Sequence, residues 1–583
     1  MAEASALNAL ANLRAAGAPV SGADALAHLL HAYGTTHIFG LCGDTTLPFY
    51  DALARLQPAL PGMRHVLTRD ERSAAYMADG YARVSGRVGV CEGPSGGGAT
   101  YILPGVVEAN ESSVPILAIT SDISTTSRGR FTLTELDQKA LFAPLTKWNA
   151  VIDNAADLPR LLRRAFVEMT TGRPGAVHLG LPFDVQKGPV SASEMWAEPE
   201  LAHYPSRRCC ADSASIVAAA RLLAAARNPL IICGGGPVIS GAESALLALA
   251  ENLDIPVATT ISGQGVIADS HPLAIGVVGS NGGTLQTRRL VQMADCVFFV
   301  GCRAGSVTTE RWRYPAPGAI KVIHLDVDAA VIGATYQADV ALIGDARATL
   351  VALNAELGQP AAPPKSRSLN REAVALAKAE KRAAFLALAQ SMETPIKPER
   401  LVEDLNAVLP DDAIVVADPG TPCPYFSAFY DWKVTGRHFI SNRAHGALGY
   451  SMSAAVGAHF GRPQANVVAV MGDGSFGFTC GELETIVREK VPITMVVVSN
   501  SVYGWIKAGQ KTGFDERYFS VDFTRTNHAA VAAAFGVKSY TVTDPAQLRD
   551  TLHRATQAGE PTLVDVLCQP LHEARAPVSE WVA

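Results

Sequence analysis

The chain lacks a basic cluster and has no long run of charge of one sign. Acidic residues slightly exceed basic ones, 55 Asp and Glu against 49 Lys and Arg, for a formal net charge of −6. A surface that binds nucleic acid or an anionic membrane needs an excess of positive charge. We therefore expect neither class of partner for this protein.

Long apolar runs and cysteine motifs are also missing. No apolar run approaches the roughly 20 residues needed to cross a bilayer. The Ala-rich stretch over residues 1–20 is expected to form one short helix, and it lacks the basic start and continuous apolar segment of a signal peptide. The ten cysteines are scattered without a CxxC pair or a Cys/His cluster, which is typical of reduced thiols. Together these absences predict a cytoplasmic protein with no membrane partner.

Length and patterning predict three α/β domains. A chain of 583 residues is too long for one hydrophobic core. Apolar strand-like runs alternate with helical segments throughout, which is typical of doubly wound parallel sheets. Polar and Pro-bearing joints near 187–208 and 357–398 separate the expected domains, which are residues 1–187, 208–356 and 397–583.

A short segment near the C-terminus carries the clearest chemical signal. An apolar run over 467–471 ends in Gly472-Asp473-Gly474, and a second run over 493–498 is followed by Asn500. Both runs read as buried parallel strands joined by a crossover helix. Ligands collect at the carboxyl ends of such strands, where carboxylate and amide oxygens hold hard cations. Glycines and a helix N-terminus also favour a phosphate, so the segment predicts a Mg²⁺–diphosphate clamp.

This segment resembles the metal–diphosphate motif of thiamine diphosphate (ThDP) enzymes. A second segment, residues 65–121, resembles the pyrimidine-binding domain of the acetolactate synthase-like branch of that family, and the likeness extends over about residues 20–570. By this resemblance Glu71 is the catalytic glutamate that meets N1′ of the aminopyrimidine ring. Composition alone favours a solvated position for Glu71 in the charged run 69–72, whereas its place directly before the segment 74–83 favours the catalytic position.

The resemblance also implies the cofactor and metal ligands. Asp473 and Asn500 match the side-chain metal ligands, and the carbonyl of Val502 matches the third. Leu448 matches the apolar residue that separates the two cofactor rings, with a plain core leucine as the alternative, and Gly420-Thr421 is either a diphosphate cap or an ordinary turn. The full predicted cofactor set is Gly420, Thr421, Gly446, Leu448, Gly472, Asp473, Gly474, Ser475, Asn500 and Val502.

Substrate-facing residues are expected in loops that relatives place near the thiazolium ring. Gln138, like its neighbour Glu135, has the alternative of a solvated loop position, and the two aromatic residues have the alternative of packing their helix onto the core. The candidates are Asp44, Thr45, Ser95, Gln138, Tyr503 and Trp505.

Three positions depart from the family pattern. Asp70 stands where relatives often carry histidine, and Ser499 replaces the first member of a frequent Asn-Asn pair. The middle domain lacks a clear FAD-binding arginine pattern, so we do not expect bound FAD.

The resemblance implies a ThDP- and Mg²⁺-dependent carbon–carbon lyase or ligase acting on 2-oxo acids, aldehydes or ketones. The alternatives are a diketone hydrolase or acyltransferase on the same scaffold, and a non-catalytic ThDP-binding relative. The family's two half-sites come from different subunits, so a homodimer or homotetramer with sites at the subunit interface is expected.

Overall fold

The computed structural model describes residues 2–358, 367–574 and 576–579. Its internal contacts divide the chain into two compact units. The first unit comprises the residues up to Arg207 together with Asn442–Gln464 and Thr479–Val491. The second unit comprises Arg208–Ser441, Ala465–Phe478 and the residues from Pro492 onward.

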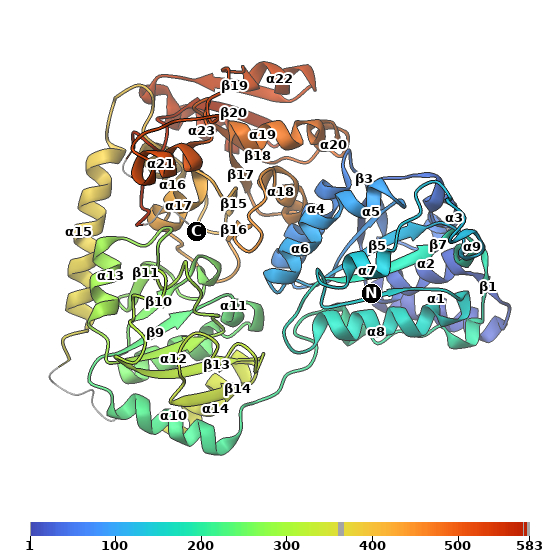
Figure 1. The fold of residues 1–583 in the computed structure, drawn as a ribbon, viewed down its shortest axis with the longest axis horizontal. Coiled ribbons are helices and arrows are strands. Elements are labelled where there is room, and N and C mark those ends of the chain that lie inside the picture. The colour runs from blue at the N-terminus through green and yellow to red at the C-terminus, as the bar shows by residue number, and fades with distance from the viewer. Residues whose placement is uncertain (1, 359–366, 575, 580–583) are drawn as a thin grey trace. The chain divides into compact units, whose positions relative to one another are not determined.

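The first unit is built on a six-stranded parallel sheet with the order β3-β2-β4-β5-β7-β6 (Figure 1). Every residue of β5 is buried, as expected for a strand covered on both faces. A short antiparallel pair, β1 with β8, lies outside this sheet. The strands are β1 (Val20–Ser21), β2 (His37–Gly40), β3 (Arg64–Leu67), β4 (Gly89–Gly93), β5 (Ile116–Asp122), β6 (Trp148–Val151), β7 (Val177–Pro182) and β8 (Pro189–Val190).

Helices connect these strands, so the predicted βα alternation is confirmed. The expected N-terminal helix is also present as α1. The helices of the first unit are α1 (Ala2–Ala16), α2 (Gly22–Ala32), α3 (Leu47–Leu56), α4 (Glu71–Ser85), α5 (Gly97–Tyr101), α6 (Leu103–Glu111), α7 (Gln138–Phe142), α8 (Leu158–Thr170), α9 (Phe183–Lys187), α18 (Ser451–Gly461) and α20 (Leu483–Arg488).

Two glycines let α4 and α18 approach closely. A Cβ built at Gly80 would lie 2.1 Å from the Ala454 carbonyl oxygen, and one at Gly457 would lie 1.9 Å from the Met77 carbonyl oxygen. Side chains at either position would therefore force the two helices apart. This contact attaches the segment from Asn442 to Gln464 to α4.

The second unit holds the other two six-stranded parallel sheets. The middle sheet has the order β11-β10-β9-β12-β13-β14, and the C-terminal sheet has the order β16-β15-β17-β18-β20-β19. All three predicted parallel sheets are thus present. The strands are β9 (Pro229–Cys233), β10 (Val257–Thr259), β11 (Ala274–Val277), β12 (Cys296–Val300), β13 (Lys321–Asp326), β14 (Val340–Ile343), β15 (Ile414–Ala417), β16 (Phe439–Ser441), β17 (Val467–Gly472), β18 (Thr494–Ser499), β19 (Lys538–Val542) and β20 (Thr562–Leu567).

The joint expected near 357–398 contains a long helix, α15, which contacts both α13 and α16 (Figure 1). Residues 359–366 of that joint lie outside the described residues. The helices that belong wholly to the second unit are α10 (Ser213–Ala225), α11 (Gly236–Ser240), α12 (Glu243–Leu253), α13 (Leu285–Gln292), α14 (Ala346–Leu357), α15 (Arg371–Ala389), α16 (Pro398–Val408), α17 (Pro422–Phe429), α21 (Gly504–Gly513), α22 (His528–Ala534) and α23 (Pro545–Thr556).

The crossover between β17 and β18 corrects one expectation. A single helix was predicted there, but the structure has α19 (Asp473–Thr479), a 3₁₀ turn over Cys480–Glu482 and then α20. The break lies at Thr479, whose backbone angles, φ −136° and ψ 10°, are not helical. The break sends the later part of the crossover into the first unit.

Among the described residues, no helix combines the length and apolarity that crossing a membrane requires. All ten cysteines are described, and each is a free thiol.

Candidate active site

The corner between β3 and α4 positions Glu71. Asp70 is the N-cap of α4, and its carboxylate accepts a hydrogen bond from the Arg72 backbone N–H at 2.7 Å. An acidic N-cap is among the most favourable, which gives a local reason for aspartate at this position. Glu71 is the first residue of the helix and is only 6% exposed, so the alternative of a solvated residue in a charged run is wrong.

Two glycines make room for the Glu71 side chain. A Cβ built at Gly93 would lie 3.2 Å from the Glu71 Cγ, and one at Gly98 would lie 3.1 Å from its Oε1. Burial, and to a smaller extent the charges of Asp70 and Glu92, raises the pKa of Glu71. A carboxyl that holds its proton to higher pH can share that proton with a ring nitrogen.

Glu482, on the 3₁₀ turn after α19, was missed by sequence reasoning. Its Oε1 accepts the Arg69 backbone N–H at 2.9 Å, and its Oε2 accepts the Thr485 hydroxyl at 2.8 Å. It thereby ties the crossover segment to the corner that carries Glu71. Burial raises the pKa of Glu482 to about 7.

Glu92 is a second buried carboxyl that was missed. The Tyr50 hydroxyl donates to its Oε1 at 2.5 Å, and the His65 Nε2 lies 3.1 Å from the same oxygen. Gly40 makes this possible, since a Cβ there would lie 2.0 Å from that oxygen. The signal was present in the sequence, because an acidic residue near the end of an otherwise apolar strand calls for a partner.

In the second unit, Asp473 and Asn500 meet at the carboxyl ends of neighbouring strands. β17 and β18 pair in parallel, with Gly472 opposite Val498. The Asp473 carboxylate accepts backbone N–H bonds from Gly474 at 2.9 Å, Asn500 at 2.8 Å and Ser501 at 2.6 Å. The sequence spacing therefore produces the predicted juxtaposition.

This arrangement fits a cation bound beside Asp473. The carboxylate is buried, its three hydrogen bonds come from neutral N–H groups, and burial raises its pKa. A divalent ion would supply the positive charge that is absent from those bonds. Among the described residues, no three His, Cys, Asp or Glu side chains form a cluster that could hold a metal ion. The roles of Asn500 and Val502 as metal ligands stay predictions.

Ser499, the position that departs from the family pattern, belongs to a buried polar cluster. Its hydroxyl donates to the Asp565 Oδ1 at 2.5 Å and lies 2.9 Å from the His528 Nδ1. The cluster joins β18, β20 and α22 directly beside Asn500. Ser499 therefore anchors the strand end that presents the predicted metal ligand.

The remaining cofactor candidates of the second unit lie around the same strand ends. Thr421 is the N-cap of α17. A Cβ built at Gly504, the first residue of α21, would lie 3.4 Å from the Thr421 Oγ1, so the starts of α17 and α21 are close together. Tyr503 packs on Gly474, where a Cβ would lie 2.8 Å from its ring. Trp505 packs against the buried core, which favours its structural alternative. Gly420 follows β15 and Ser475 follows β17, and their cofactor contacts stay predictions.

Gly446 and Leu448 lie in the loop over 443–449, which belongs to the first unit. Gly446 and Gly449 have φ of +76° and +84°, a left-handed backbone that favours glycine. The Asn442 side chain donates to the Ala447 carbonyl at 2.6 Å and closes the turn. Leu448 is half-buried, so it is not a plain core leucine.

Of the four predicted substrate residues in the first unit, Thr45 and Ser95 are brought together, whereas Asp44 and Gln138 do not join them. The Thr45 hydroxyl donates to the Ser95 hydroxyl at 3.1 Å and lies 2.6 Å from that of Ser121. Asp44 is exposed at the start of the same loop. Gln138 is neither solvated nor free: it is 1% exposed and bonds the Thr120 hydroxyl and the Ser121 carbonyl with the two ends of its amide. A structural role therefore explains Gln138 better than substrate contact does.

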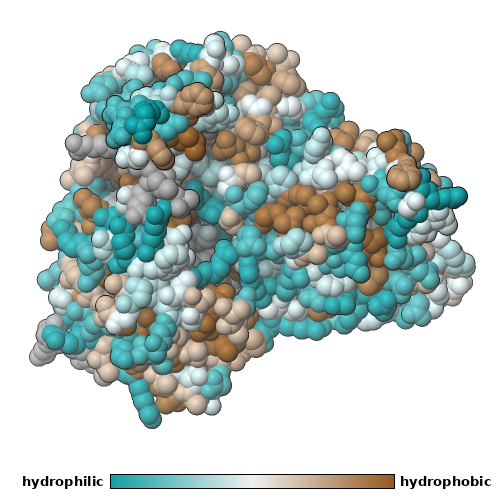
Figure 2. All heavy atoms as spheres, in the orientation of Figure 1, coloured by the Kyte–Doolittle hydropathy of each residue, from teal (hydrophilic) through white to brown (hydrophobic). Residues whose placement is uncertain are grey.

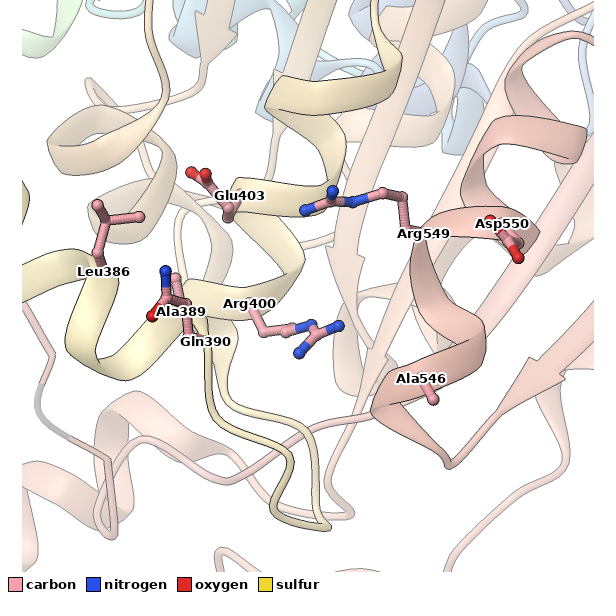
Figure 3. A pocket seen from close by; sticks show the side chains of 8 residues that line it. All are labelled: Leu386, Ala389, Gln390, Arg400, Glu403, Ala546, Arg549 and Asp550. Atoms are coloured by element: carbon pink, nitrogen blue, oxygen red, sulfur yellow. The ribbon is translucent and has the colours of Figure 1, made fainter.

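A surface pocket of about 380 Å³ in the second unit lies apart from all of these residues (Figure 3). Arg400 from α16 and Arg549 from α23 point toward one another across it. Both guanidinium groups are already occupied by the buried carboxylate of Asp404, at 3.2 Å and 2.8 Å. The pocket contains none of the predicted site residues, so it is not the candidate active site.

Comparison with known families identifies all three domains. The N-terminal TPP binding domain of thiamine pyrophosphate enzymes matches residues 20–141, the central domain matches 216–353 and the C-terminal TPP binding domain matches 418–566. These matches lie inside the three domains expected from the sequence.

Several relatives that match nearly the whole chain are described as acetolactate synthases. A probable acetolactate synthase large subunit from Methanocaldococcus jannaschii is 35% identical over 94% of this chain and 92% of the relative. Acetolactate synthase large subunits from Lactococcus lactis and Porphyra purpurea are each 31% identical, over 94% and 95% of this chain and 92% of each relative. The chain therefore belongs to the thiamine pyrophosphate enzymes and is related to acetolactate synthase.

Proposed function

We propose that this protein uses ThDP and Mg²⁺ to make or break a carbon–carbon bond next to a carbonyl group. Its substrates would be 2-oxo acids, with aldehydes or ketones as acceptors, as in an acetolactate synthase-like decarboxylase or carboligase. The observation that carries this proposal is the buried position of the Glu71 side chain. A buried carboxyl with a raised pKa, in a space formed by two glycines, suits a group that shares a proton with the cofactor's pyrimidine ring.

Bound ThDP supplies a nucleophilic carbon and an electron sink, so the protein chiefly binds, orients and shields it. Glu71 would hold the proton at N1′. Asp473, with Asn500 and the Val502 carbonyl, would hold the cation that binds the diphosphate.

We further propose a homodimer or homotetramer whose cofactor sites form at the subunit interface. The first unit exposes large apolar side chains, including Phe131 at 101% and Leu133 at 87%, and Figure 2 shows brown, apolar atoms gathered over part of that unit. Apolar patches of this kind are typical of interaction surfaces. A second copy of the chain would cover them.

The test is a substrate panel. Protein loaded with ThDP and Mg²⁺ is incubated with 2-oxo acids, with and without aldehydes, and the products are identified by mass. Carbon dioxide together with an aldehyde or a 2-hydroxy ketone would support the proposal. Ring-opened acids from a cyclic diketone, or an acyl ester of phosphate or coenzyme A, would replace it with the hydrolase or acyltransferase alternative.

Two variants make the panel specific. Asp473→Ala should abolish product formation and ThDP retention, because the diphosphate loses its bridging cation. Asp515→Ala is the matched control, since Asp515 is exposed and pairs only with Arg517 among the described residues. If Asp473→Ala binds ThDP as tightly as the parent in a calorimetric titration, the proposed clamp is wrong.

A further inference from the structure

A buried charged network joins α4 and α6 in the first unit. Arg83 donates through Nε to the Asp79 Oδ2 at 2.8 Å and through Nη2 to the Glu108 Oε1 at 3.2 Å. Asp79 and Glu108 are both 0% exposed. Two carboxylates around one guanidinium leave the network with one uncompensated negative charge, which must be met by further hydrogen-bond donors.

Those donors come from the loop over 443–449 and the residue that follows it. The Tyr450 hydroxyl donates to Asp79. The second Glu108 oxygen, Oε2, accepts the backbone N–H of Ala444 at 3.2 Å and that of His445 at 2.7 Å. The loop is therefore held at its start by Glu108 and at its end by Asp79.

Glu108 makes the larger contribution to this anchoring. Its Oε1 also accepts the Ser112 hydroxyl at 2.6 Å, so four donors converge on its two oxygens. An ionised carboxylate accepts at all four positions, and these donors oppose the burial that raises the pKa of Glu108. Residues 337 positions apart in the sequence, Glu108 and His445, are thus linked by a charge-assisted hydrogen bond.

We propose that Glu108 is a positioning residue for the pyrimidine ring of ThDP, acting through the 443–449 loop that carries Gly446 and Leu448. The inference rests on the proposed cofactor site, and nothing in it requires Glu108 to touch the cofactor. Without the carboxylate, the backbone N–H groups of Ala444 and His445 lose their acceptor, and the loop loses the geometry that presents its backbone to the ring.

Glu108→Gln is a precise test because glutamine keeps the size of the side chain. The glutamine amide has one acceptor oxygen and one NH₂ group, which only donates. In one orientation the NH₂ group faces the loop N–H groups, and in the other it faces Arg83 and Ser112, so one pair of partners loses its acceptor in either case. Glu111→Gln is the matched control. Glu111 ends the same helix, but its ion pair with Arg173 is long, at 3.9 Å, and partly exposed.

The experiment compares two ligands by calorimetry in the presence of Mg²⁺. ThDP engages both the diphosphate clamp and the pyrimidine loop, whereas inorganic pyrophosphate engages only the clamp. Glu108→Gln should weaken ThDP binding by about 10- to 100-fold, the usual effect of leaving buried partners of a charged group unsatisfied. Pyrophosphate binding should stay within about twofold of the parent, and Glu111→Gln should match the parent for both ligands.

The remaining outcomes separate the hypotheses. Unchanged ThDP affinity in Glu108→Gln overturns the inference, and equal losses for both ligands overturn it in favour of a general structural role. A parent protein that binds pyrophosphate but not ThDP would instead contradict the proposed function. If Glu108→Gln does not fold, Tyr450→Phe removes the bond at the other end of the loop and should lower ThDP affinity alone. Unchanged ThDP affinity in that folded variant would overturn the inference as well.

Discussion

Several buried acids in the first unit serve different purposes, as their partners show. Glu108 is surrounded by donors and is held as a carboxylate acceptor. Glu71 packs against Gly93 and Gly98, and its pKa is raised chiefly by burial. Glu482 accepts a backbone N–H and a hydroxyl, and its pKa is raised to about 7. Burial raises the pKa of Glu71, Glu108 and Glu482 alike, so burial alone does not identify the catalytic acid.

At the residue scale, we expect Glu71→Gln to bind ThDP but to activate it slowly. Glutamine still bonds the pyrimidine ring but cannot exchange a proton with it. The rate of hydrogen–deuterium exchange at the thiazolium C2, measured by NMR after acid quench, should fall by about 10²- to 10⁴-fold, or roughly 3–5 kcal/mol of barrier. Exchange as fast as in the parent would show that Glu71 is not the activating group.

Glu482 gives a prediction about pH and stability. Its pKa rises from 4.5, the ordinary value, to about 7 in the folded protein, because burial disfavours the charged form. The folded state then binds a proton more tightly than the unfolded state between those values. The stabilisation from this group is complete below pH 4.5 and is lost as the pH rises through about 7.

Glu482→Gln should abolish the fall in the free energy of unfolding that Glu482 causes as the pH rises. The glutamine oxygen can still accept the Arg69 N–H, and its NH₂ can donate to the Thr485 hydroxyl. We expect the variant to unfold close to the parent at pH 5 and to be more stable than the parent at pH 8, by up to about 3 kcal/mol. Thermal unfolding followed by circular dichroism at both pH values checks this prediction. Equal unfolding temperatures for the two proteins at pH 8 would contradict it.

At the element scale, the close packing of α4 on α18 holds the 443–449 loop in place. The two helices meet through Gly80 and Gly457, whose missing side chains allow backbone contact. The Arg462 guanidinium also donates through Nε to the Val84 carbonyl at 2.9 Å, near the ends of the same helices. The loop is thus carried by a contact between elements that lie far apart in the sequence.

Gly80→Ala should therefore destabilise the protein. Overpacking costs about 1–3 kcal/mol, which exceeds the gain of about 1 kcal/mol from replacing glycine in a helix. Gly513→Ala is the matched control, because a Cβ there meets nothing within 4 Å. Urea unfolding should show a lower midpoint for Gly80→Ala and an equal or higher one for Gly513→Ala. An unchanged midpoint for Gly80→Ala would mean that the helices can separate at little cost.

At the scale of the whole molecule, we expect at least a dimer in solution. The cofactor sites proposed above form at a subunit interface, which requires a second copy of the chain. Multi-angle light scattering should give at least twice the chain mass of 61.3 kDa under assay conditions. An active species with the mass of one chain would contradict the proposed interface.

The middle domain should carry no flavin. The sequence lacks the arginine pattern expected for FAD in that domain, and the chemistry proposed above involves no net redox step. The purified protein should show no absorbance band near about 450 nm, where flavins absorb. Activity should not change when FAD is added, and a stoichiometric flavin required for activity would overturn the expectation.

The sequence by itself determined the sheets, the three domains and the meeting of Asp473 with Asn500. These features depend on local patterns: apolar strands of the right length, connected by helices, bring their carboxyl ends to one edge. One predicted element differed from the structure, because the crossover helix between β17 and β18 is broken at Thr479. The backbone angles of a single residue depend on its surroundings, which the local sequence pattern does not describe.

Only the tertiary structure decided which charged groups meet inside the first unit. The bonds from Glu482 to Arg69 and from Glu108 to His445 join positions 413 and 337 residues apart. The hydroxyl of Tyr50 reaches Glu92 for the same reason. No local sequence pattern encodes such pairs, because they depend on how helices and strands pack in three dimensions. Packing brings each buried acid into contact with hydrogen-bond donors that lie far from it in the sequence.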